Sequence, residues 1–203
     1  MGHSRASKAI THARLVEAAA ARFKERGVDG ISLSDLMKEL KLTHGGFYRH
    51  FDSRDELVAE ALELALTDSG QVMREYLFDG PKPDIGRFVD VYLGEAHRDG
   101  RAAGCAVAAL AADAARKGID VQAQFRTQIE RNIEAMVEAL EADSIDDPRG
   151  TALLILSVLY GALTMARAVG DSALSREVLR TARKQILKIT GTPKRARAKA
   201  KKN

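Results

Sequence analysis

The sequence predicts an all-α protein of about nine helices, in which a small N-terminal unit of three helices precedes a larger C-terminal helical bundle. Three observations predict this class. The 203 residues include four prolines and no tryptophan. Apolar residues recur at helical spacing over most of the chain, and glycine, proline or aspartate interrupts each stretch. Because no strand-like alternation persists, we expect no β-sheet.

The composition is that of a protein with a substantial apolar core. Hydrophobic residues make up 45% of the chain, and no apolar run near the N-terminus indicates a secretory signal. Cys105 is the single cysteine, so it cannot form an internal disulfide and fits a reducing compartment. We therefore expect a cytoplasmic protein.

The charge is distributed unevenly along the chain. Residues 1–51 carry a net charge of +4, residues 52–193 a net charge of −6, and the last ten residues a net charge of +6. A basic N-terminal unit on an acidic body suggests that this unit meets a polyanion. An ordinary solvated surface would explain the same pattern about as well.

Helix caps delimit the N-terminal helices. Ser32, with Asp35 three residues later, is a good N-cap for the second helix, and Thr43 caps the third. Ser53 and Glu56 make a full capping box for a fourth helix that runs to about Phe78. We expect these four helices over about 8–26, 33–40, 44–50 and 54–78.

Five further helices are expected beyond a break at residues 80–83, which read Gly-Pro-Lys-Pro. They cover about 84–98, 103–117, 120–141, 148–169 and 172–190. The resulting division has an N-terminal unit at 1–52, a body at 53–191 and a disordered basic tail at 192–203.

The segment 150–166 is apolar on nearly every side, which invites a membrane interpretation. It is shorter than the roughly 20 residues that a span needs. We favour a helix that is buried on two sides, by its own domain and by a partner chain. The residues predicted to form this paired-helix interface are Leu153, Leu156, Leu163, Val178, Leu179 and Ile186.

The third helix has the composition of a helix that enters the major groove of DNA. Gly45 and Gly46 are each unfavourable in a helix by roughly 1 kcal/mol relative to alanine, so close approach to DNA would explain them. A tight helix–helix crossing is the alternative. Phe47 and Phe51 are expected in the core, which leaves Tyr48 and neighbouring polar residues for phosphates.

The run Leu42-Thr-His-Gly-Gly-Phe-Tyr-Arg-His-Phe51, followed by Ser53-Arg-Asp-Glu-Leu57, resembles the DNA-binding signature of the tetracycline-repressor (TetR/AcrR) family. The segment 97–118 resembles one subgroup of these regulators. In this chain His44 stands where lysine is commoner, which puts the base preference in doubt. Arg54 also replaces a commoner lysine and keeps the charge, although guanidinium and ammonium geometries differ. The predicted DNA-binding residues are Ser32, Lys41, Thr43, His44, Gly45, Gly46, Tyr48, His50 and Arg54.

The resemblance implies that Thr43, Tyr48, His50 and Arg54 contact phosphates and that His44 and Gly45 read bases. It also implies a ligand cavity in the body. The helix over 103–117 is rich in alanine, which either packs closely or leaves a cavity. The candidate cavity residues are Leu62, Leu66, Phe88, Tyr92, Cys105, Leu110, Phe125, Ile129 and Tyr160, and each could equally be plain core.

Cys105 and His97 are the only cysteine and the only histidine beyond position 50, which could suggest a nucleophile pair. No third orienting group can be placed. The subgroup resemblance suggests instead a sensor of oxidants or electrophiles, and an inert core thiol is the alternative. His97, Asp99 and Asp113 are too scattered for a metal site, so we expect no metal and no cofactor.

These observations predict a homodimeric, ligand- or redox-responsive transcriptional regulator, most simply a repressor. It would bind a pseudo-palindromic operator in double-stranded DNA and release it when a small molecule or electrophile shifts the body. A small-molecule-binding or thiol-dependent helical enzyme is the alternative, which leaves the glycine-rich third helix unexplained.

Overall fold

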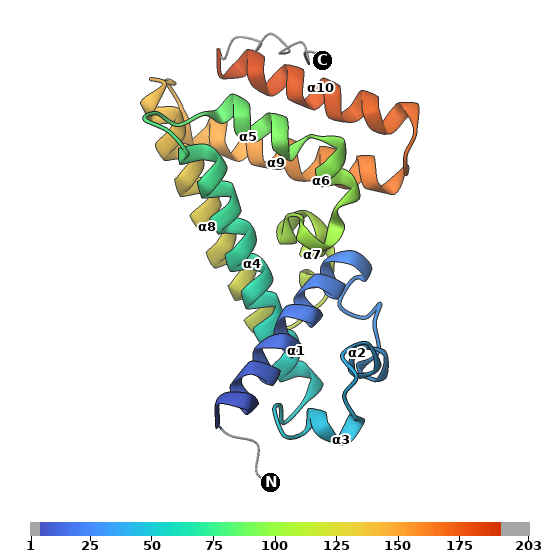
Figure 1. Ribbon diagram of the computed structural model, residues 1–203. Helices are drawn as coiled ribbons and strands as arrows, with labels where there is room; N and C mark the ends of the chain where they lie inside the picture. The colour runs from blue at the N-terminus through green and yellow to red at the C-terminus, as the bar shows by residue number, and fades with distance from the viewer. Residues whose placement is uncertain (1–4, 192–203) are drawn as a thin grey trace, which may run out of the picture.

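A computed structural model describes residues 5–191, and these residues form ten α-helices and one 3₁₀ turn, without a strand (Figure 1). The predicted tail at 192–203 lies outside the described residues. The elements are α1 (Arg5–Arg26), α2 (Leu33–Glu39), α3 (His44–Phe47), α4 (Arg54–Phe78), α5 (Ile85–Tyr92), α6 (Glu95–Asp99), η1 (Arg101–Ala103), α7 (Ala106–Ala114), α8 (Ile119–Ala142), α9 (Pro148–Ala168) and α10 (Ala173–Ile189). The all-α prediction is confirmed.

The predicted caps start α2, α3 and α4. The side chains of Ser32, Thr43 and Ser53 each accept a hydrogen bond from the amide three residues later, at 3.1, 3.2 and 3.1 Å. Each bond satisfies one of the amides that has no acceptor within the helix. Gly27 ends α1 with a φ of +80°, a conformation that favours glycine.

The body differs from the sequence prediction in two places. The helix expected over 84–98 is two helices, because the chain is extended at Gly94 (φ −78°, ψ 152°) between α5 and α6. The helix expected over 103–117 begins only at Ala106, since Gly104 and Cys105 are extended and a 3₁₀ turn precedes them. Apolar periodicity does not register such local breaks, so ten α-helices replace the predicted nine or so.

Helix α4 connects the two ends of the molecule (Figure 1). The short helices α2 and α3 lie at one end beside α1, and α4 runs from there along α8 toward α5, α9 and α10 at the other end. One apolar cluster joins Leu15, Phe47 and Phe51 of the N-terminal unit to Leu62 and Leu110 of the body. The N-terminal unit therefore shares its core with the near half of the body.

Helix α9 is the helix among residues 5–191 that is long and apolar enough to cross a membrane by composition. Its inner face is buried against α8 and α10 through residues such as Ile155, Leu159 and Leu163. The helix thus occupies the position of a core helix, as the prediction of burial by its own domain requires.

Candidate functional site

The surface of α3 is open at the positions predicted to read bases. His44 and Gly45 are exposed, and Tyr48 at the end of the helix is 58% exposed. A Cβ placed on Gly45 would have no neighbour within 4 Å. A tight helix crossing therefore does not explain Gly45, and the face is free for an external partner. At Gly46 a Cβ would lie 3.3 Å from Thr43 Oγ1, so that glycine also serves the cap.

A groove separates α3 from the first turns of α1, and both walls carry polar side chains. Its residues include the predicted Lys41, Thr43, Gly45, Gly46 and His50, together with Ser7, Lys8, Thr11 and Arg49. The α1 residues were missed because a helical stripe directs attention to its apolar side. Lys8 could have indicated this wall of the groove, since it is a basic residue that precedes the apolar stripe of α1.

His50 lies deeper than the outward position that was predicted for it. Its side chain is half-buried, and among the described residues its Nδ1 atom has no hydrogen-bond partner. Burial lowers the pKa of His50, with smaller contributions from His12, Lys8 and Arg49. The histidine is therefore mainly neutral at pH 7, and its unpaired Nδ1 atom is buried beneath the groove surface.

The Arg54 side chain, predicted to contact DNA, is hydrogen-bonded and ion-paired within the protein. Its Nη2 donates to the Val28 carbonyl at 2.7 Å, and its Nη1 lies 3.6 Å from the Asp29 carboxylate. Lys117, between α7 and α8, also donates to Asp29, at 3.0 Å, and this bond lowers the Asp29 pKa. Arg54 thus joins α4 to the loop after α1, and Asp29 joins that loop to the body. Ser32 is exposed and shares a 2.7 Å hydrogen bond with Asp35.

The body contains a cavity of about 520 Å³ between α4, α5, α6, α8 and α9, and the loop from η1 to the N-cap of α7 closes one side of it. Four of the predicted cavity residues line it: Phe88, Tyr92, Cys105 and Tyr160. The structure places Leu62, Leu66, Leu110 and Phe125 in the packed core instead, and Ile129 packs partly buried against both clusters. Further residues line the cavity without having been predicted, among them Val72, Met73, His97 and Asn132. Their positions along the sequence do not indicate which helices pack against them.

A chain of hydrogen bonds crosses the wall of this cavity. Gln128 Nε2 donates to Asn132 Oδ1 at 2.8 Å, and Asn132 Nδ2 donates to the Tyr160 hydroxyl at 2.9 Å. Burial raises the pKa of Tyr160, the Cys105 thiol adds to the rise and the bond from Asn132 opposes it. Gly70 makes room for this chain, since a Cβ there would lie 2.1 Å from Gln128 Nε2.

His97 does not act on the thiol of Cys105. Its Nε2 accepts the backbone N–H of Cys105 at 3.0 Å, and its Nδ1 donates to the Tyr92 carbonyl at 2.7 Å. This pair of bonds defines a neutral ring, and burial lowers the His97 pKa accordingly. The arrangement positions the loop that carries Cys105 and offers no base to its sulfur. The described residues also contain no group of three side chains suited to a metal ion.

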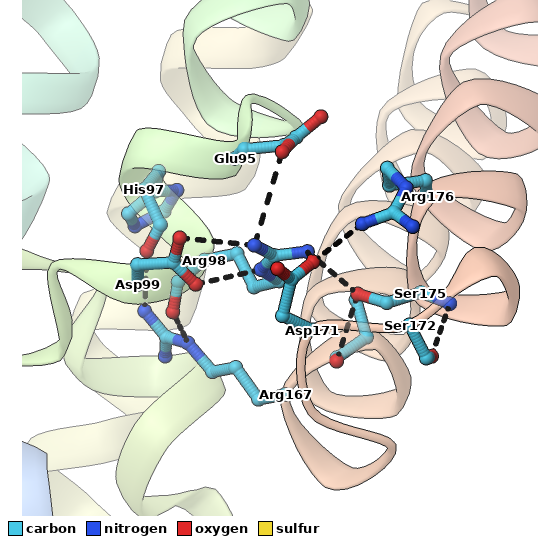
Figure 2. A network of polar contacts seen from close by, with 10 residues as sticks. Glu95, His97, Arg98, Asp99, Arg167, Asp171, Ser172, Ser175 and Arg176 are labelled. Atoms are coloured by element: carbon cyan, nitrogen blue, oxygen red, sulfur yellow. Dashed lines mark hydrogen bonds and ion pairs between the residues drawn. The ribbon is translucent and has the colours of Figure 1, made fainter.

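Arg98 anchors α6 to the turn between α9 and α10 (Figure 2). The side chain is 4% exposed and pairs with Asp99 at 2.7 Å and Asp171 at 3.3 Å. Its Nη1 also donates to the Ser175 hydroxyl at 3.1 Å. Arg167 of α9 completes the anchor, because it donates to the carbonyls of residues 97 and 98 at 2.9 and 3.1 Å.

The outer face of α9 and α10 is apolar. Leu153, Leu154, Met165 and Leu174 are each close to half exposed or more, and a shallow groove runs between the two helices. Of the predicted interface residues, Leu153 lies on this face and Val178 borders the groove. The structure places Leu156, Leu163, Leu179 and Ile186 in the protomer's own core.

Two family models match the chain. Residues 15–61 match the model described as bacterial regulatory proteins, tetR family. Residues 81–185 match the model described as the C-terminal domain of LmrA/YxaF-like transcriptional regulators. Together they cover most of the three-helix unit and most of the body.

Curated relatives and solved structures agree with these matches. The HTH-type transcriptional repressor NemR of Escherichia coli is 24% identical over 180 residues, which cover 83% of this chain and 88% of that protein. An HTH-type transcriptional regulator of Mycobacterium tuberculosis is 26% identical over 78% of this chain and 84% of its own length.

A TetR transcriptional regulator from Chloroflexus aurantiacus has the same fold, with a TM-score of 0.79 at 24% identity over 91% of this chain and 96% of that one. The reduced form of E. coli NemR has a TM-score of 0.75 at 22% identity, over 91% and 99%. These two likenesses concern the fold.

Proposed function

The chain belongs to the TetR family of bacterial regulatory proteins, and on this premise we propose that it is a cytoplasmic, homodimeric repressor that an effector releases from its operator. The observation that carries this proposal is the open face of α3. An exposed glycine with no packing role stands there beside an exposed histidine and tyrosine. The named relatives are transcriptional regulators, which disfavours the enzyme alternative.

On DNA, α3 would enter the major groove with His44 and Gly45 toward the base edges. Thr43, Tyr48 and Lys41 would bind phosphates on one side, while Lys8 and Thr11 of α1 extend the same groove. We propose His50, which lines this groove, as a further phosphate ligand. Ser32 and Arg54 stay among the proposed contacts, although Arg54 would have to leave Asp29 at least in part.

The dimer would form through the outer face of α9 and α10, where exposed apolar side chains such as Leu154 and Met165 lie along one surface. Two copies of α3 would then read a pseudo-palindrome, with centres about 34–36 Å apart or a multiple of this. An apolar face of this kind is costly to leave in water, which favours a second copy as its cover.

The effector would occupy the 520 Å³ cavity, whose size suits a drug-sized molecule. Release follows if the effector favours a body conformation in which the two α3 helices are wrongly spaced. Cys105 lines this cavity, so covalent modification of its thiol is a second route to the same shift. If Cys105→Ser responds to oxidants and electrophiles like the parent, the thiol route fails.

The test is footprinting on the promoters next to the chain's own gene, followed by affinity measurements at several salt concentrations. We expect protection of a pseudo-palindrome and a steep loss of affinity with salt, because phosphate contacts release counterions. A folded dimer that protects no neighbouring promoter would count against the proposal. A helical enzyme would show no such salt-dependent DNA affinity.

A further inference from the structure

The inner end of the cavity contains a polar group without a partner. Tyr92 lines the cavity and is 7% exposed, and among the described residues its buried hydroxyl has no nitrogen or oxygen partner and only the weakly accepting Cys105 thiol beside it. A buried hydroxyl of this kind ordinarily finds an acceptor, since leaving it unpaired costs roughly 1–3 kcal/mol. The Tyr92 hydroxyl is therefore a donor that awaits an acceptor from a bound molecule.

The N-terminus of α7 ends at the same place. Cys105 is its N-cap and lines the cavity, but its side chain makes no capping hydrogen bond. The first amides of a helix lack acceptors within the helix, and the helix dipole there favours negative charge. Tyr92 and the Cys105 thiol are close enough that the thiol adds to the burial that raises the Tyr92 pKa.

Two cationic side chains lie near Cys105 and the N-terminus of α7. Arg167 lies against Gly104, where a Cβ would be 2.7 Å from its Nη2, and its printed hydrogen bonds go to backbone carbonyls. Lys24 of α1 is half-buried nearby and interacts electrostatically with Asp68 and, after it, with Cys105. Arg167 also interacts electrostatically with Cys105. Among the described residues no carboxylate lies within ion-pair distance of either cation. Burial lowers the pKa of both side chains.

Much of the rest of the cavity wall is apolar and is formed by residues such as Val72, Met73, Phe88 and Val91, while Asn132 and Tyr160 already bond to each other. Its two carboxylates are already paired with arginines. Asp90 contacts Arg183 at 2.5 Å, and Glu95 lies 3.9 Å from Arg98. The cavity thus combines an apolar body with one electropositive end.

We propose that the end of the cavity formed by the Tyr92 hydroxyl and the N-terminus of α7 binds the carboxylate of an amphipathic organic acid. The proposal rests on the assignment of this cavity as the effector site. One carboxylate oxygen accepts from Tyr92 and the other faces the first amides of α7, while the apolar part fills the remainder. The two oxygens of a carboxylate match the two kinds of donor at this end, the Tyr92 hydroxyl and the first amides of α7, whereas a phosphate brings a third oxygen that these donors leave unpaired.

This assignment also connects the ligand to the DNA-binding unit. Lys24 belongs to α1, which packs against η1 and supports α2 and α3. A carboxylate at the α7 N-terminus attracts Lys24 and thereby changes how α1 rests on the body. The negative charge of the ligand is then the property that affects the DNA-binding unit.

The test uses calorimetry on the full-length protein without DNA, with 2-naphthoate and decanoate as probes and the corresponding neutral amides as references. We expect each acid to bind at least about ten-fold more tightly than its amide. Tyr92→Phe and Lys24→Gln should each reduce that ratio several-fold, since each removes a group that favours the charged form. Equal affinity for acid and amide, or tighter binding of naphthyl phosphate than of naphthoate, would overturn the proposal.

Matched variants separate this effect from a general loss of packing. Lys184→Gln removes an exposed lysine on α10 and should keep the acid-to-amide ratio. Tyr160→Phe removes a cavity hydroxyl that already bonds Asn132 and should change both affinities together. If acids bind selectively but do not release the operator, the proposed regulation fails and the ligand class stands. If amides bind equally and release the operator, the ligand class fails and the regulation stands.

Discussion

Gly45 occupies a helical position in which a larger side chain would be tolerated by the protein. Nothing lies within 4 Å of a Cβ at this position, and glycine is less favourable than alanine in a helix by roughly 1 kcal/mol. The residue therefore reduces the stability of α3 without any gain in packing. Close approach of the helix backbone to DNA is the physical reason that remains.

We predict that Gly45→Ala keeps or slightly raises the melting temperature and weakens operator binding at least about ten-fold, because the new methyl group stands between α3 and the bases. Thermal unfolding and a DNA titration measure the two effects. Gly118→Ala is the matched control, since a Cβ there also has no neighbour within 4 Å and the site is at the start of α8. Unchanged operator affinity in Gly45→Ala would remove this residue from the interface.

His97 makes stability depend on pH through its buried, neutral ring. Burial lowers its pKa below the usual value of 6.5, so between the two pKa values the unfolded chain binds the proton more strongly. The contribution of neutral His97 to the free energy of unfolding is fully present above about pH 6.5 and decreases as the pH drops below that value. The fall stops only once the folded protein binds the proton too.

We accordingly predict that His97→Gln shows a smaller loss of melting temperature between pH 7.5 and pH 5 than the parent. His44→Gln, which changes an exposed histidine on α3, should keep the parent's pH dependence. Parallel curves for the parent and His97→Gln would mean that this ring does not contribute the linkage. Half-buried His50 adds a dependence of the same sign, which is why the difference between variants is the quantity to compare.

At the scale of elements, α6 is a short helix fixed by side chains from elsewhere in the chain. Arg98 ties it to the turn between α9 and α10, and Arg167 binds its last carbonyls (Figure 2). The helix also forms part of the cavity wall through His97. A ligand that moves α6 therefore acts directly on the helices of the proposed dimer interface.

We predict that Arg98→Met lowers the melting temperature by roughly 5 °C or more. The substitution leaves the buried Ser175 hydroxyl without its donor and removes the guanidinium that pairs with both Asp99 and Asp171. Arg176→Met, which removes an exposed partner of the same Asp171, should change it by about 1 °C or less. Differential scanning calorimetry compares the two. Similar losses in both variants would show that the buried arginine contributes no more than a surface ion pair.

At the scale of the whole molecule, the DNA-binding unit and the near half of the body share one apolar core. Leu15 and Phe51 belong to the same cluster as Leu62 and Leu110. Asp29 adds a polar connection between the loop after α1 and Lys117. A shift of the body is therefore transmitted to α3 as a rigid displacement rather than through a flexible linker.

We predict that Leu154→Glu and Met165→Glu each convert the proposed dimer to a monomer and abolish specific operator binding, because one copy of α3 reads only half of the site. Sedimentation velocity and footprinting measure the two losses. Ile119→Glu is the control, since Ile119 is 75% exposed at the start of α8, away from α9 and α10. A variant that stays dimeric would place the interface on another face.

The sequence by itself determined the helical class, the caps at Ser32, Thr43 and Ser53, and the family, because these depend on residues a few positions apart. Only the tertiary structure decided which residues line the cavity and which face of α9 and α10 is covered. Leu156 and Leu154 lie on one apolar helix two residues apart, yet one is buried and the other half exposed. When a helix is apolar on several sides, its periodicity does not indicate which side faces the core. The packing of α8 and α10 against α9 determines which side is buried.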